Sequence, residues 1–110
     1  MRKSHLRNMI KGWFVGGFEP SVFNTEVVEV GVKRYQAGDS ESRHHHKVAT
    51  EITVVLDGRA RMNGHEYASG DILTILPGES TDFIALTDVT TVVVKLPSVR
   101  NDKYGGDAAC

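Results

Sequence analysis

The sequence has only one cysteine, Cys110, and it is the last residue. A single cysteine cannot form an internal disulfide, so packing must stabilise the fold, and a reducing compartment is compatible with it. We interpret Cys110 as part of a frayed end, with an intermolecular disulfide as the alternative.

An excess of charge of one sign is also lacking. The net charge is −1, so no overall field attracts nucleic acid or an anionic membrane.

Long apolar runs are missing as well. No run approaches the ~18 apolar residues of a membrane-spanning helix. The apolar residues 13–18 follow several basic residues, but this stretch is too short and too rich in glycine for a signal peptide. No helix-turn-helix or other nucleic-acid-binding element is visible. We therefore predict a cytoplasmic protein that binds neither nucleic acid nor a membrane.

Short runs of β-branched residues separated by turn residues recur along the chain. Asp57-Gly58 and Asn63-Gly64 are two such turns, and they supply the positive φ angles that two-residue hairpins need. About nine short strands with frequent turns are typical of a sandwich or barrel, so residues 1–110 are predicted to form one all-β domain. The expected strands span residues 13–18, 26–35, 44–46, 51–56, 60–62, 66–67, 72–75, 82–85 and 90–96.

The run His44-His45-His46 is the most distinctive feature of the sequence. Side chains alternate between the two faces of a strand, so His44 and His46 point the same way, and we expect His45 to point outward into solvent. Neighbouring side chains on one face start roughly 7 Å apart. Two imidazoles at that spacing can converge on one metal ion, which binds each ring nitrogen at about 2.0–2.1 Å.

Glu51 follows this run after a turn predicted through residues 47–50. At the start of the next strand it can face back toward the histidines and share a face with Thr53. An inward carboxylate needs a partner, and a cation bound by two histidines and one carboxylate would be such a partner with positions left open. The alternative is a solvated histidine run, with Glu51 paired to Lys47 or Arg43 on the surface.

The spacing of these residues resembles the first motif of the cupin superfamily. That motif reads glycine, five residues, His-x-His, three or four residues, glutamate, six residues and glycine. Its fixed positions are filled here by Gly38, His44, His46, Glu51 and Gly58.

The second cupin motif is matched in part. Residues 70–71 and 77–79 fit it, but Leu76 stands where a proline is usual and Thr81 where a histidine is usual. The resemblance covers roughly residues 35–83. It implies that the fourth metal ligand of the family is missing, since a threonine hydroxyl is a poor replacement for imidazole.

The resemblance implies a jelly-roll β-barrel of six to eight strands that holds one divalent metal (Fe, Mn, Ni or Zn) on His44, His46 and Glu51. We expect the barrel core to span about residues 26–97 and residues 101–110 to form a disordered tail. Either the metal site has three protein ligands, or the barrel is degenerate and has lost its metal.

Four further residues are candidates for the wall of a pocket. Thr53 is expected to hydrogen-bond to Glu51 or to be an ordinary strand residue. By alternation Phe83 shares the face of Thr81, as a core aromatic or as a pocket wall. Tyr35 either reaches the barrel mouth together with Lys33 or belongs to a solvated edge.

The apolar residues 13–18 are expected to cover a barrel edge or to exchange between two subunits, and the resemblance implies a homodimer. For function we expect a metal-binding cupin that acts on or binds a small polar metabolite, a sugar or an organic acid, as an isomerase, lyase or dioxygenase. The pattern places no second carboxylate or lysine inside, which counts against an enzyme. The alternatives are a non-catalytic small-molecule-binding barrel with a degenerate metal site and a structural barrel without a site.

Overall fold

The structure, a computed structural model, describes residues 1–107 and is built almost entirely of β-strands. The only helical element in this range is a single 3-10 turn, η1 (Leu6–Asn8). The strands are β1 (Trp13–Gly16), β2 (Phe23–Asn24), β3 (Glu29–Tyr35), β4 (Ser40–His45), β5 (Thr50–Asp57), β6 (Arg59–Met62), β7 (His65–Ala68), β8 (Ile72–Ile75), β9 (Ser80–Ala85), β10 (Val89–Leu96) and β11 (Tyr104–Gly105).

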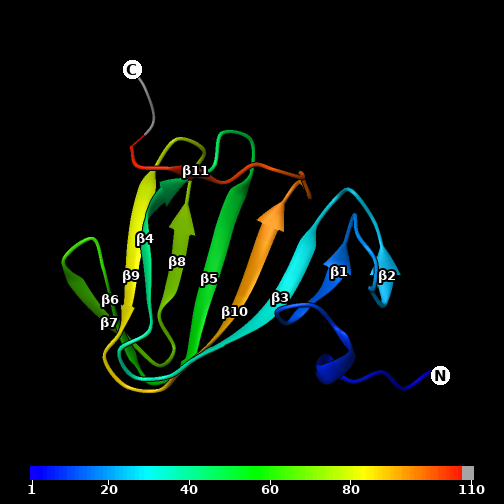
Figure 1. Ribbon diagram of the computed structural model, residues 1–110, viewed down its shortest axis with the longest axis horizontal. Coiled ribbons are helices and arrows are strands. Elements are labelled where there is room, and N and C mark those ends of the chain that lie inside the picture. The colour runs from blue at the N-terminus through cyan, green and yellow to red at the C-terminus, as the bar shows by residue number, and fades with distance from the viewer. Residues whose placement is uncertain (108–110) are drawn as a thin grey trace.

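The strands form two sheets, as Figure 1 shows. One sheet has the order β2-β1-β3-β10-β5-β8, and the other has the order β11-β4-β9-β6-β7. Their facing sides enclose the apolar core, because side chains of both sheets alternate inward and outward. The buried core cluster consists of Val55, Ala60, Met62, Ile75, Phe83, Ala85 and Val89. The all-β fold predicted from the sequence is confirmed.

Strand β10 illustrates how the sequence produces this arrangement. Its first six residues alternate between buried and half-buried positions, with Val89, Thr91 and Val93 on the buried face. It lies between β3 and β5 and pairs with both in antiparallel fashion. On β5 the same alternation buries Thr53 and Val55, which confirms that these residues share the inward face.

Of the two predicted hairpin turns, Asn63-Gly64 forms, whereas Asp57-Gly58 leads from one sheet to the other because β5 and β6 do not pair. Asn63 and Gly64 have φ angles of 51° and 78° and connect β6 to β7. Gly58, between β5 and β6, has a φ of 88° and lies against the chain at Asp88. A Cβ atom at Gly58 would approach the carbonyl oxygen of Asp88 to 2.0 Å, so only glycine fits there.

The N-terminal apolar stretch pairs within its own chain. Strand β1 lies antiparallel to β3 and parallel to the short β2, so it covers the edge of the β3–β10–β5 sheet. Residues 13–16 thus lie on the sheet edge of their own chain, and the expected choice between covering this edge and exchanging between subunits stays a prediction. The strand predicted from residue 26 begins instead at Glu29.

The C-terminal segment corrects one expectation. Residues 101–110 were expected to be disordered, but Tyr104 and Gly105 form β11 and pair with His45 and His44 of β4. Figure 1 shows this segment crossing the upper ends of the sheets. Residues 108–110, including Cys110, lie outside the described residues.

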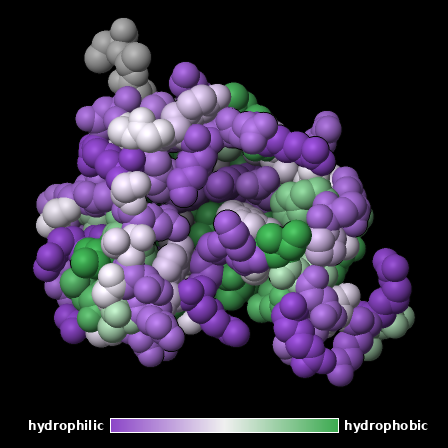
Figure 2. Space-filling model, in the orientation of Figure 1, coloured by the Kyte–Doolittle hydropathy of each residue, from purple (hydrophilic) through white to green (hydrophobic). Residues whose placement is uncertain are grey.

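The outer surface is mainly polar on the face seen in Figure 2, with apolar residues in smaller groups. Within residues 1–107, no helix has the length and apolar composition needed to span a membrane.

Candidate functional site

A β-bulge in β4 determines which side chains face the space between the sheets. Glu41 pairs with Phe83 and His44 pairs with Thr81, so three steps on β4 oppose two steps on β9. On a regular strand Glu41 and His44 would point to opposite faces, but an extra residue restores the same face. The bulge therefore brings both Glu41 and His44 inward.

These side chains line a cavity of about 290 Å³, which we call the inner cavity. All seven site residues predicted from the sequence contribute to its wall, from four different strands and the loop after β4. They are Tyr35, His44, His46, Glu51, Thr53, Thr81 and Phe83. The structure thus brings the predicted site residues together. Their role as metal ligands remains a prediction.

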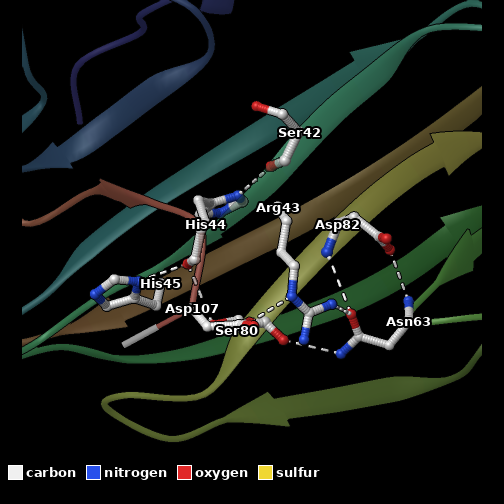
Figure 3. Close-up of polar contacts among 9 residues, drawn as sticks. Ser42, Arg43, His44, His45, Asn63, Ser80, Asp82 and Asp107 are labelled. Atoms are coloured by element: carbon white, nitrogen blue, oxygen red, sulfur yellow. Dashed lines mark hydrogen bonds and ion pairs between the residues drawn. The ribbon is translucent and has the colours of Figure 1, made fainter. Parts of the chain in front are cut away.

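His44 presents one ring nitrogen to the cavity. Its Nδ1 lies 3.0 Å from the carbonyl oxygen of Ser42, as Figure 3 shows. A carbonyl can only accept, so Nδ1 carries the proton of this hydrogen bond, and the tautomer with that arrangement has its lone pair on Nε2. A backbone acceptor of this kind fixes the tautomer of metal-binding histidines.

His46 follows on the loop after β4, and its ring lies edge-on to that of His44 with centroids 5.5 Å apart. The side chain is 5% exposed, and its Nε2 is buried without a hydrogen-bond partner in the described part of the chain. Burial, with the positive charge of Lys95 and the neighbouring His44, lowers the pKa of His46 to about 4. The ring is therefore neutral at pH 7, the form that binds a metal.

Glu51 completes the predicted ligand set from the start of β5. It is half-buried, and the Thr53 hydroxyl donates a hydrogen bond of 3.2 Å to its Oε2. This bond confirms the polar role considered for Thr53. The surface alternative for Glu51 does not form, because Arg43 pairs with Asp107 and the ammonium of Lys47 lies over the ring of Tyr104.

The donor types suit a divalent transition metal, since two neutral imidazoles and a carboxylate are its usual ligands. The unpartnered Nε2 of His46 fits a bound ion, because buried polar atoms without partners are rare. However, no three His, Cys, Asp or Glu side chains within residues 1–107 lie close enough together to form an assembled metal site.

The structure corrects the expectation that His45 is solvated. It points away from the inner cavity, as alternation predicts, but it is 4% exposed and not solvated. Its ring stacks on Tyr104 with centroids 5.5 Å apart, and its Nδ1 lies 2.7 Å from the carbonyl oxygen of Gly106. The C-terminal segment therefore covers it.

The strand that would carry the fourth ligand is regular. Thr81 lines the inner cavity opposite His44, and its neighbour Asp82 points outward, where it accepts a hydrogen bond of 2.8 Å from the amide of Asn63. Figure 3 shows this outward group beside Arg43. The acid at position 82 therefore does not replace the missing histidine.

Two polar residues that sequence reasoning had left unpaired form a hydrogen-bonded pair. The Tyr35 hydroxyl donates 3.2 Å to Oε1 of Glu41, and both residues line the inner cavity. Burial, followed by the charge of Glu41, raises the pKa of Tyr35, so the phenol stays protonated. Glu41 was missed because strand parity alone places it opposite to His44. No sequence signal marks the bulge.

Four lysines that were not predicted as a group also face this cavity: Lys11, Lys33, Lys95 and Lys103. Lys33 donates 2.8 Å to the carbonyl oxygen of Lys11, and its Nζ lies 5.4 Å from the ring centroid of Trp13. Lys95 lies 5.1 Å from the same ring. The indole can lie between them because Gly31 has no side chain. A Cβ atom there would be 2.6 Å from the indole.

Asp102 anchors the loop between the predicted ligands. It is 6% exposed and accepts hydrogen bonds from three consecutive amides, Lys47 at 3.0 Å, Val48 at 3.1 Å and Ala49 at 2.9 Å. Burial raises the pKa of Asp102, but the amides of Ala49, Lys47 and Val48 together outweigh it and lower the pKa below 3.8. The ionised carboxylate thus holds the loop that links His46 to β5.

Comparison with solved structures identifies the fold. An uncharacterized conserved protein with a double-stranded beta-helix domain from Klebsiella pneumoniae has a TM-score of 0.70 at 21% identity, over 79% of this chain and 76% of that chain. The DMSP lyase DddQ from Ruegeria pomeroyi has 0.68 at 20% identity, over 83% and 48%. A sugar phosphate isomerase from a cupin superfamily, from Silicibacter pomeroyi, has 0.59 at 23% identity, over 64% and 50%.

No profile of a known protein family matches the sequence, and no curated protein matches it. At identities below 25% the structural likeness concerns the fold and not the reaction. Two facing sheets in this strand order, together with these neighbours, show that the chain has a double-stranded β-helix fold, the fold that the neighbours named as cupins share.

Proposed function

We propose that this protein binds one divalent metal ion through His44, His46 and Glu51 and acts on a small polar metabolite. The observation that carries the proposal is the Nε2 of His46, which is buried and has no hydrogen-bond partner within residues 1–107 and lies on a ring beside that of His44. Glu51 lines the same cavity. A metal bound there would act as a Lewis acid toward a substrate oxygen.

Glu41 supplies a group that can accept or return a proton. It is the second carboxylate of the inner cavity, and it is not needed as a metal ligand. The hydrogen bond from Tyr35 positions it and leaves its other oxygen available. Proton transfer by a carboxylate suits an isomerase or a lyase better than a dioxygenase. Two proteins with the same fold are named as an isomerase and a lyase.

Bound metal is the first quantity to measure. Elemental analysis of untagged protein, supplied in turn with Fe, Mn, Ni and Zn, is expected to give close to one ion per chain. The double variant His44→Ala/His46→Ala should lose it, whereas the control His65→Ala, an exposed histidine on β7, should retain it. Wild-type protein that retains no ion after supply with each metal would contradict the metal centre.

Activity gives a second test. Once a substrate is known, Glu41→Gln should lower kcat by at least about a hundredfold while bound metal stays unchanged, because general acid–base groups contribute 10²–10⁴-fold. Tyr35→Phe should have a smaller effect, since it removes only the group that orients Glu41.

The second candidate function is a non-catalytic binding barrel. Thr81, which replaces the histidine expected for the family, favours it, because three ligands hold a metal less tightly than four. In that case the double histidine variant would leave ligand binding intact, and no turnover would depend on Glu41.

We also propose that the protein is a cytoplasmic homodimer. Its support is the free edge at β2, where Phe23 is 66% exposed beside Val22 at 39%. An exposed apolar edge strand favours pairing with a second copy. Light scattering should give twice the chain mass for the wild type and the chain mass for Phe23→Lys.

A further inference from the structure

A second cavity adjoins the inner one and differs from it in character. This outer cavity has a volume of about 440 Å³, and Trp13, His46, Lys95 and Lys103 line both cavities. Half of the rest of its wall is apolar, with Ile10, Phe18, Pro20, Ala49 and Val99, and the other half is polar or charged, with Glu19, Glu29, Arg100, Asn101 and Asp102. The two cavities therefore lie side by side at Trp13, and the outer one offers apolar side chains beyond the wall that carries the predicted metal ligands.

The inner cavity carries an excess of positive charge. Four lysines, at positions 11, 33, 95 and 103, face it against two glutamates. Lys95 has a partner in Glu29 at 3.7 Å, but Lys33 and Lys103 form no ion pair with an acidic side chain of the described chain. Burial and the charges of the other lysines lower the pKa of Lys33, against the opposing effect of Glu41.

A buried hydroxyl lies beside this charge. Thr91 is 1% exposed, lines the inner cavity, and has no hydrogen-bond partner for its Oγ1 among the described residues. It pairs directly with Lys33 across β10 and β3, and by alternation it shares a face of β10 with Lys95. A buried hydroxyl without a partner lowers the free energy of unfolding unless a ligand forms a hydrogen bond with it. Ammonium groups beside a hydroxyl without a hydrogen-bond partner are suited to bind an anionic group of a ligand.

We propose that the ligand of this site is an organic carboxylate with an apolar substituent. Its carboxylate lies beside Lys33 and the hydroxyl of Thr91, which pair across β3 and β10, and its substituent extends past Trp13 toward the outer cavity. A monoanionic carboxylate fits better than a phosphate, because Glu41 and Glu51 in the same cavity repel a second negative charge. This inference rests on the proposed function for treating the bound acid as the substrate.

The ligand preference is measured with cyclohexylacetate, its neutral amide cyclohexylacetamide, and acetate. Trp13 is the only tryptophan of the chain and lines both cavities, so its fluorescence reports binding. The acid is expected to bind at least about tenfold more tightly than the amide, which lacks the charge, and than acetate, which lacks the apolar part. Metal-depleted and metal-loaded protein are both titrated, so that a carboxylate bound by the metal cannot produce the preference alone.

Matched variants test the anion contacts. Lys33→Met should weaken binding of cyclohexylacetate about tenfold, and Lys47→Met, which makes the same change outside both cavities, should leave it within about twofold. Thr91→Val should weaken binding at least threefold, whereas Thr90→Val, its neighbour on the opposite face of β10, should not. The comparison of ligands on the wild type needs no variant, so a variant that fails to fold leaves the test intact.

The outcomes separate this inference from the metal centre. Equal affinity for the acid and the amide, equal affinity for the acid and acetate, tighter binding of inorganic phosphate, or an equal effect of Lys47→Met would each overturn it. Bound metal without the carboxylate preference overturns this inference alone. The preference in protein that retains no metal supports this inference and overturns the proposed metal centre.

Discussion

Replacing Asp102 by alanine should destabilise the protein far more than its position in the C-terminal segment suggests. The carboxylate accepts hydrogen bonds from the amides of Lys47, Val48 and Ala49. Water can replace it at the first two, which belong to exposed residues, but Ala49 is 3% exposed. With about 0.5–1 kcal/mol for each exposed amide and about 1–3 kcal/mol for the buried one, Asp102→Ala should cost roughly 3 kcal/mol.

Urea unfolding measures this loss directly, and thermal unfolding should show a fall in Tm of roughly 10–15 °C for a domain of this size. The matched control is Asp107→Ala, since Asp107 is an exposed acid of the same segment whose partner is the exposed Arg43. A surface pair of that kind contributes about 0–1 kcal/mol. A loss for Asp102→Ala no larger than for Asp107→Ala would refute the reasoning.

The same interaction has a defined pH dependence. The pKa of Asp102 in the folded protein lies below the ordinary value of 3.8. Its contribution is therefore fully present above about pH 4 and is lost as the pH falls through the lowered pKa. The difference in unfolding free energy between the wild type and Asp102→Ala should stay constant from pH 7 to about pH 5 and shrink in strong acid. A constant difference down to pH 2 would mean that the carboxylate's charge is not what holds the loop.

Three further changes test the site. Thr53→Val removes the hydrogen bond to Glu51 and should weaken metal binding about tenfold in a chelator competition, with unchanged stability as the check on folding. Thr81→His should add a fourth ligand from the position opposite His44 and tighten metal binding, and a weaker affinity would show that position 81 does not face the ion. Gly31→Ala would put a Cβ atom 2.6 Å from the indole of Trp13, so it should shift the tryptophan emission and cost about 1–3 kcal/mol, measured by urea unfolding.

The local part of the structure could be predicted from the sequence because it depends on alternation and turns. The buried face of β5, with Thr53 and Val55, follows from period two within one strand. Asn63 and Gly64 define their hairpin by backbone preference alone. The shared cavity of His44 and His46 follows from the same parity, together with the cupin-like spacing.

The rest depends on pairing between distant segments, which parity cannot reveal. Glu41 reaches the inner cavity only because β4 gains an extra residue opposite β9. His45 is buried because Tyr104, far along the chain, stacks on it. The polar composition around residue 102 suggested disorder, yet one acid there matches three amides of a loop that precedes it by more than fifty positions.

This long-range contact sets an order for the assembly of the site during synthesis. The complete histidine and glutamate motif is translated by residue 51, but the acid that fixes the intervening loop is added only at Asp102. A nascent chain, or a product cleaved before that residue, would carry every predicted metal ligand and still lack the anchored loop. A segment translated after all the predicted ligands is therefore the one that completes the site. A functional test of a shortened chain would report the loss of this anchor and not the absence of the ligands.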